Sequence, residues 1–157
     1  MKIKIAIIFG GFSKEREISF AGGRTVYDNL NKALFEPVPI FVDSFGNFVL
    51  LNWEFVYKGS IRDFYPPADS LPAKLGEFQI YAERLGELNV AEQAKLLDAI
   101  GEIVPPAEFK NHFEFAFLCL HGPFGEDGKV LALLENAQIP YSGSGINPSK
   151  IGIDKAL

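Results

Sequence analysis

The segment His121–Gly128 (HGPFGEDG) contains the residue types best suited to chemistry: a histidine, two acids and three glycines. It follows the apolar run Phe115–Leu120 and precedes a second apolar run, Val130–Leu134. This order predicts a buried strand, a glycine-rich turn and then a helix. Ligands bind at the carboxyl ends of strands in open α/β sheets, so His121 stands where a site would be. A lone histidine can also be structural, and the residues alone leave both roles open.

A second candidate turn, Gly10–Glu17 (GGFSKERE), follows the first predicted strand. One interpretation is a ligand-facing loop, with helix-terminal amides and the Glu15 carboxylate at its mouth. The other is a tight turn in which Glu15 and Glu17 only stabilise the positive end of the next helix. Its glycines do not form the dinucleotide pattern G-x-G-x-x-G, and there is no P-loop lysine pattern.

Other polar residues have simpler explanations. Glu126 and Asp127 precede a predicted helix, where carboxylates cap the helix end, so we interpret them as turn-holding groups and not as a metal pair. His112 lies in a polar connecting segment, and a surface position is the default for Lys155. Cys119 is the single cysteine, which excludes a disulfide framework or a cysteine metal site.

The composition indicates one globular domain. The 157 residues are 48% hydrophobic, which suits a packed core. The formal net charge of −5 gives no electrostatic reason to expect nucleic acid or an anionic membrane as a partner. No apolar run approaches the roughly 18 residues of a membrane span, and Met1–Phe9 is strand-like and lacks the features of a signal peptide. We therefore expect a cytoplasmic protein.

A βαβ unit is predicted to position the first turn. Residues Lys2–Phe9 have the continuous apolar pattern of a strand buried on both faces, and Pro37–Val42 forms the next strand. A helix is predicted between them from about residue 15 to 34, with Ser13 as its N-cap. Gly22-Gly23 lies inside this helix, where each glycine costs about 1 kcal/mol relative to alanine. We therefore expect a close backbone approach there.

The rest of the chain predicts further strands and helices in alternation. In order these are a hairpin of residues 48–51 and 55–57, a loop-rich segment over 59–75, a helix over 89–104, the central strand over 115–120, a helix ending near 137, a short strand over 139–142 and a helix opened by Asn147-Pro148. Asn89 and Glu92 have the spacing of a capping box. The alternation predicts an α/β fold, a mostly parallel sheet with helices on both faces.

Three motifs together resemble the N-terminal domain of the D-alanine–D-alanine ligase family. They are GGFSKEREIS at 10–19, HGPFGEDG at 121–128, and YSGSGI at 141–146 leading to Asp154-Lys155. Their order and their places on the predicted turns agree, and the resemblance spans nearly the whole chain. It implies a Rossmann-like domain of the type that precedes an ATP-grasp fold. It also implies ATP- and Mg²⁺-dependent joining of two D-alanines through a D-alanyl phosphate, for peptidoglycan synthesis, by a homodimer.

The resemblance implies roles for individual residues. Glu15 resembles the carboxylate that binds the ammonium group of the first D-alanine, and His121 resembles the histidine beside that substrate's carboxylate; both are therefore predicted to be substrate-binding and catalytic. Ile18 would line the same pocket, and Lys155 resembles a lysine that reaches the ATP phosphates. A zwitterionic amino acid needs an acceptor for its ammonium and a donor for its carboxylate, which Glu15 and His121 can supply. No metal ligand is expected in this chain.

The resemblance also predicts the domain organisation. We expect residues 1–157 to form a single N-terminal substrate-binding domain, with the ATP-grasp portion, which holds most ATP and Mg²⁺ contacts, absent from this chain. The chain alone is then expected to be inactive. Two alternatives remain open: a ligase that joins D-alanine to D-lactate or D-serine, and a stand-alone flavodoxin-like binding module.

Overall fold

The computed structural model describes residues 2–58 and 76–153. Five strands within these residues form one sheet in the order β4-β3-β2-β1-β5. Strand β1 (Ile3–Gly10) pairs in parallel with β2 (Phe35–Val42) on one side and with β5 (Phe115–Leu118) on the other. Strand β3 (Phe48–Leu51) is antiparallel to β2, and β4 (Gly101–Ile103) is antiparallel to β3. The predicted α/β fold with a mostly parallel sheet is confirmed, and the two antiparallel pairings make the sheet mixed.

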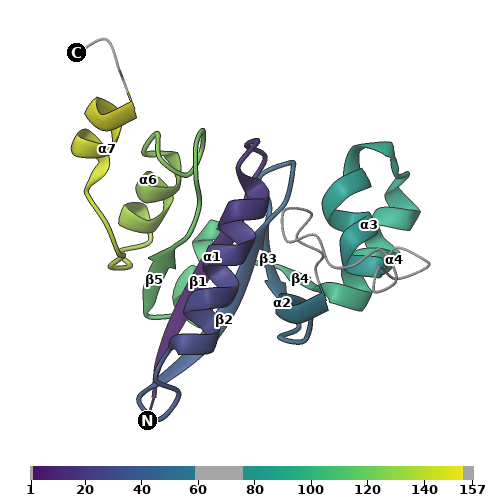
Figure 1. Cartoon of the computed structure of the whole chain (residues 1–157), viewed down its shortest axis with the longest axis horizontal. Coiled ribbons are helices and arrows are strands. Elements are labelled where there is room, and N and C mark those ends of the chain that lie inside the picture. The colour runs from purple at the N-terminus through teal and green to yellow at the C-terminus, as the bar shows by residue number, and fades with distance from the viewer. Residues whose placement is uncertain (1, 59–75, 154–157) are drawn as a thin grey trace.

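Helices cover both faces of the sheet, so a hydrophobic core lies on each face. The side chains of β1 alternate between these two cores. Ile7 and Phe9 face the core that includes α1 (Arg16–Asn29), whereas Ala6 and Ile8 face the core that includes α6 (Lys129–Asn136). Figure 1 shows α1 lying over β1 and β2, with α3 and α4 at one side and α6 and α7 at the other. The remaining helices are α2 (Phe55–Lys58), α3 (Glu77–Arg84), η2 (Leu85–Glu87), α4 (Val90–Ile100), η3 (Pro106–Glu108), α5 (Phe109–His112) and α7 (Ile146–Ile153).

The glycine pair inside α1 lets this helix approach the sheet. A Cβ atom on Gly23 would lie 2.7 Å from the ring of Phe9, which no ordinary packing allows. A Cβ atom on Gly22 would meet Cys119 at an ordinary 3.8 Å. The close approach that the sequence predicts is therefore confirmed, and Gly23 is the residue that makes it.

Several predicted element boundaries are wrong. Helix α1 ends at Asn29 instead of residue 34, because the Asn31 side chain accepts the Ala33 N–H (3.0 Å) and its carbonyl accepts the N–H groups of the next turn, leaving Leu34 exposed. The predicted hairpin does not form: β3 pairs with β2 and β4, and residues 55–58 are helical. Phe55 and Val56 are buried against the α1 core, so tertiary packing decides their conformation.

The other differences lie at element ends. The capping box of Asn89 and Glu92 is confirmed, with side-chain bonds of 2.9 and 3.0 Å, but its helix ends at Ile100 and residues 101–103 form β4. Residues 139–142 make a single parallel bridge between Tyr141 and Ala116 instead of a strand. Helix α7 begins at Ile146, one residue before the predicted Asn147 cap. The predicted loop over 59–75 lies outside the described residues.

Candidate functional site

The first turn is held by backbone contacts and one buried hydroxyl. Gly10 ends β1 and Gly11 follows it, with φ angles of +97° and +87°, a region that glycine adopts at little cost. The Gly10 N–H donates to Ser19 Oγ (2.9 Å), and the Gly11 N–H donates to the Val42 carbonyl (2.7 Å). Ser19 is fully buried, so its hydroxyl ties the turn to the first turns of α1.

Glu15 stands at the mouth of this turn as the N-cap of α1. Its N–H donates to Ser13 Oγ (3.2 Å), and its carbonyl accepts the Ser19 N–H (3.0 Å). The N-cap predicted at Ser13 is therefore wrong by two residues. The Ser13 hydroxyl does, however, accept the N–H of the N-cap residue, Glu15. Within residues 2–58 and 76–153, the Glu15 carboxylate has no hydrogen-bond or ion-pair partner.

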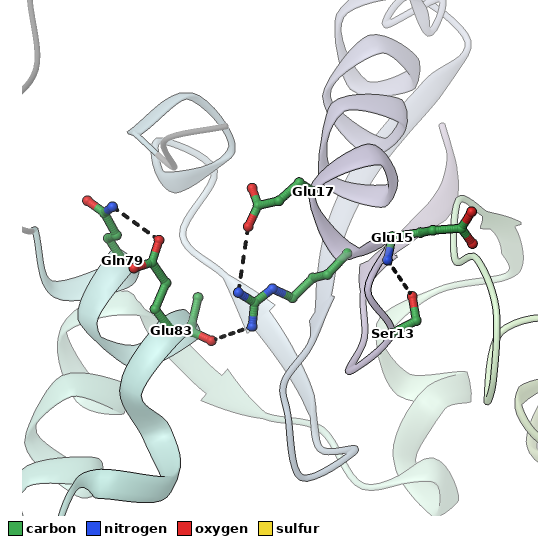
Figure 2. Close-up of polar contacts among 7 residues, drawn as sticks. Ser13, Glu15, Glu17, Gln79 and Glu83 are labelled. Carbon is green, nitrogen blue, oxygen red and sulfur yellow. Dashed lines mark hydrogen bonds and ion pairs between the residues drawn. The ribbon is translucent and has the colours of Figure 1, made fainter. Parts of the chain in front are cut away.

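Two acids of the same turn point in different directions, as Figure 2 shows. Glu17 faces Arg16, with Oε1 3.6 Å from Nη2, whereas the Glu15 side chain extends away from that pair. Arg16 also donates from Nη1 to the Ala82 carbonyl in the last turn of α3 (2.8 Å). Glu17 is thus engaged by a cation, and Glu15 keeps its acceptor atoms for another group.

In the second turn both carboxylates bind the turn's own backbone. Glu126 Oε2 accepts the Gly122 N–H (2.9 Å), Asp127 Oδ2 accepts the Phe124 N–H (3.0 Å), and Asp127 Oδ1 accepts the Lys129 N–H (3.1 Å). The Lys129 ammonium also lies 3.0 Å from Asp127 Oδ2. The turn-holding role predicted for these acids is confirmed.

The electrostatics of Asp127 reflect these contacts. Partial burial acts to raise the pKa of the carboxyl, but the N–H of Phe124 and the N–H and ammonium of Lys129 outweigh it, so the pKa is lowered from its ordinary value. The ionised carboxylate is the form that the turn binds.

His121 lies at the start of the second turn with its side chain 41% exposed. Its Nδ1 lies 3.6 Å from Glu126 Oε1, so the carboxylate that binds the next backbone N–H also faces the ring. The Glu126 carboxylate therefore lies beside the His121 ring, which the sequence did not predict.

The two turns meet at Gly122, the residue that follows His121. A Cβ atom at Gly122 would lie 3.1 Å from Ser13 Cβ and 3.6 Å from Glu15 Oε2. The φ angle of Gly122 is +69°, so glycine is favoured here by both space and conformation. The structure thus brings the Glu15 carboxylate against the backbone beside His121, from a position more than a hundred residues away in the sequence.

The remaining predicted residues are placed as follows. Ile18 follows Glu15 by three residues on α1, on the same side of the helix, and its side chain is 55% exposed. Lys155 lies outside the described residues. The third motif lies beside the second turn, because Ser142 Oγ accepts the Leu118 N–H (2.9 Å) at the end of β5.

A hollow of about 520 Å³ separates the second turn from the third motif. Its walls come from β5 and the chain after it, from α6, and from the turn and helix that begin at Ser142. The lining residues are Leu118, Leu120, Gly125, Glu126, Leu131, Ser142, Gly143, Ser144, Pro148, Ser149 and Gly152. The third motif therefore forms a wall beside the turn of His121.

One buried acid escaped the sequence analysis. Asp43 follows β2 and is fully buried, where its carboxylate accepts the N–H groups of Phe45 and Asn47 and the hydroxyl of Tyr81 in α3 (3.0 Å). Burial and the Asp43 charge raise the pKa of Tyr81, so this phenol remains a donor. No sequence pattern indicated that α3 would close over this acid.

Two general properties complete the description of the site. Among the described residues no three His, Cys, Asp or Glu side chains gather closely enough to hold a metal ion. The same part of the chain contains no helix with the length and apolar character needed to cross a membrane.

Comparison with known proteins assigns this chain to a family. Residues 4–144 match the family model described as D-ala D-ala ligase N-terminus. The chain is similar to D-alanine--D-alanine ligase of Nocardia farcinica, with 32% identity over 154 residues, which are 98% of this chain and 39% of the relative. The chain thus spans well under half the length of that relative. The resemblance predicted from the three motifs is confirmed.

Solved structures show the same fold. The D-alanine-D-alanine ligase from Coxiella burnetii matches 99% of this chain and 40% of its own, with a TM-score of 0.63 and 23% identity. The Bacillus anthracis D-alanine--D-alanine ligase complexed with ATP matches 98% of this chain and 33% of its own, with a TM-score of 0.55 and 25% identity.

Proposed function

The chain belongs to the D-alanine–D-alanine ligase N-terminal family, and from this premise we propose that it is the N-terminal domain of an ATP-dependent ligase that joins two D-alanines for peptidoglycan synthesis. In this proposal the domain contributes the subsite for the first D-alanine and acts in the cytoplasm. Assembly of the ligase as a homodimer stays a prediction from the resemblance.

The observation that carries the proposal is the contact between the two turns. The Glu15 carboxylate has no partner in the described part of the chain, and it lies against the backbone at Gly122, beside His121. D-Alanine is a zwitterion, so its subsite requires an acceptor for the ammonium and a donor for the carboxylate. Glu15 supplies the first and His121 the second, from adjacent ends of β1 and β5.

The neighbouring residues support these roles. The Glu126 carboxylate lies 3.6 Å from His121 Nδ1, and in this proposal the other ring nitrogen, Nε2, is the one that meets the substrate carboxylate. Ile18 lies on the Glu15 side of α1 with much of its side chain exposed, where it would contact the substrate methyl group. A binding geometry held by packing and by hydrogen bonds requires less ordering when the substrate arrives.

The chain does not by itself fit the cofactors of the reaction. In the proposed reaction ATP would transfer its γ-phosphoryl group to the carboxylate of the first D-alanine, giving D-alanyl phosphate and ADP, and the amine of the second D-alanine would then displace phosphate. The family resemblance implies that most ATP and Mg²⁺ contacts are made by an ATP-grasp portion, and we propose the same here; the described residues gather no metal-binding set. Lys155 is proposed to reach the ATP phosphates. The 157-residue chain alone should therefore synthesise no dipeptide, and formation of D-alanyl-D-alanine from ATP and D-alanine by the purified chain would contradict this part.

The subsite is tested by titrating the chain with D-alanine and following backbone amide signals by NMR. Glu15→Gln should weaken D-alanine binding roughly 10- to 150-fold, because a hydrogen bond between charged groups contributes about 1.5–3 kcal/mol. Glu17→Gln is the matched control: it lies two residues away, but its carboxylate faces Arg16, so binding should be unchanged. Equal affinity in wild type and Glu15→Gln would remove Glu15 from the site.

A further inference from the structure

Phe124 has a backbone conformation that phenylalanine rarely adopts. Its φ angle is +75°, whereas most of the positive-φ residues in the described part of the chain are glycines. A side chain with a Cβ atom raises the free energy of this conformation, and such residues persist where the surrounding structure holds them. A glycine here would avoid that cost, so the ring itself must be useful.

The strained residue is held from two sides. Its N–H donates to Asp127 Oδ2 (3.0 Å), which fixes the backbone of the second turn. Its ring lies 6.1 Å from the ring of Phe48 in β3, and Phe48 packs in turn against Phe109 at 5.0 Å. Phe124 is therefore anchored to the core between β3 and the second turn.

The other side of the Phe124 ring contacts the first turn. The ring of Phe12 lies 5.4 Å away at an angle of 43°, a tilted arrangement that is favourable for aromatic pairs. Phe12 is 47% exposed, so it contributes little to the core. It lies three residues before Glu15, and Phe124 lies three residues after His121. The pair therefore connects the two turns that carry the proposed substrate-binding groups.

We propose that the Phe12–Phe124 ring contact is a positioning contact that sets the spacing between Glu15 and His121. The inference rests on the proposed function, since it concerns the same D-alanine subsite. Phe124 supplies a fixed surface, because its backbone is held by Asp127 and its ring by Phe48. Phe12 carries that position to the first turn. Neither ring touches the substrate in this proposal; both act through the residues that do.

Removing Phe12 gives the direct test. In the D-alanine titration, Phe12→Ala should weaken binding about 2- to 10-fold, the range expected for one aromatic pair. Phe12→Tyr, which keeps the ring, should bind as wild type does. The matched control is Leu34→Ala, since Leu34 is 60% exposed at the opposite end of the sheet and should leave binding unchanged. Wild-type affinity in Phe12→Ala would overturn the inference.

Two variants of Phe124 separate the ring from the backbone strain. Phe124→Ala keeps the strained conformation and loses the ring, whereas Phe124→Gly loses both. Both should bind D-alanine more weakly than wild type, while Phe124→Gly should be the more resistant to urea. Adding Phe12→Ala to Phe124→Ala should weaken binding no further, since one contact is lost only once. Full additivity of the two losses would contradict a shared contact.

A readout without ligand separates this inference from the proposed function. Amide hydrogen exchange at Glu15 and Gly122 should become faster together in Phe12→Ala if the ring pair holds the turns against each other. Unchanged exchange at both amides would overturn the inference. If exchange becomes faster at both while wild type fails to bind D-alanine, the positioning contact stands and the proposed substrate is wrong.

Discussion

The two strand-to-helix turns of this domain use their acids in opposite ways. In the second turn, Glu126 and Asp127 accept backbone N–H groups of the turn itself, and Asp127 also pairs with Lys129. In the first turn, glycine conformations and the buried Ser19 hydroxyl shape the backbone, and the Glu15 carboxylate has no partner among the described residues. Glu126 and Asp127 therefore stabilise the second turn, whereas Glu15 of the first turn is available to a ligand.

This difference gives a physical criterion for assigning roles to acids that look alike in sequence. Both turns place carboxylates directly before a helix, where the helix dipole favours negative charge. That common feature explains their position but does not distinguish their functions. The distinguishing observation is whether the carboxylate oxygens already accept hydrogen bonds within the protein.

The largest expected effect tests the second turn. Asp127→Asn should lower the free energy of unfolding by about 1.5–3 kcal/mol. In the wild type each carboxylate oxygen of Asp127 accepts one backbone N–H, from Phe124 or from Lys129, and in the variant an NH₂ group would replace one of these acceptors. Glu15→Gln should change it by less than about 0.5 kcal/mol. Urea unfolding at neutral pH measures both. A loss in Glu15→Gln as large as that in Asp127→Asn would show that the first turn also depends on its acid.

The pH dependence of stability should separate the same two acids. The pKa of Asp127 is lowered in the folded chain, so its contribution is fully present above the unfolded-state pKa, about 4. It is lost as the pH falls through the lower folded-state pKa. The difference in unfolding free energy between wild type and Asp127→Asn should therefore be larger at pH 7 than at about pH 3. A difference independent of pH would rule out the charge as its cause.

A slightly smaller effect on stability is expected from a substitution in α1, the helix that follows the first turn. Gly23→Ala should lower the free energy of unfolding by about 1–3 kcal/mol, because the new Cβ atom would lie 2.7 Å from Phe9. Gly22→Ala, the matched control, meets Cys119 at 3.8 Å and should be neutral or stabilising by up to about 1 kcal/mol. Urea unfolding of both variants decides the matter. Equal effects would mean that α1 can move away from the sheet.

The sequence predicted those parts of the fold that local patterns determine. The continuous apolar runs of β1 and β2 and the capping box at Asn89 and Glu92 were read correctly, because strand burial and helix capping depend on neighbouring residues. The sequence did not predict that β3 pairs with β4 or that residues 55–58 form a helix. These features depend on contacts between distant segments, such as the burial of Phe55 and Val56 in the core that includes α1.

The site divides in the same manner. The turn-holding role of Glu126 and Asp127 followed from their position before a helix. The family resemblance implied that Glu15 and His121 meet at one substrate, but no pattern around either turn did so. The ring contact of Phe12 with Phe124 was not predicted at all, because it requires β1 and β5 to be neighbours in the sheet. Strand order is a property of the whole chain, and no local pattern around either turn encodes it.

The smallest difference between variants is expected in the reactivity of the buried thiol of Cys119. Cys119 follows β5, is 8% exposed, and lies beneath α1 at Gly22. Burial raises its pKa to about 11, so roughly one thiol in a thousand is ionised at pH 8. The folded chain should therefore react far more slowly with 5,5′-dithiobis(2-nitrobenzoic acid) than the urea-unfolded chain. Glu15→Gln should keep the wild-type rate, because its carboxylate holds nothing in place, whereas Asp127→Asn should react faster as the second turn loosens. Equal rates in these two variants would contradict the contrast between the turns.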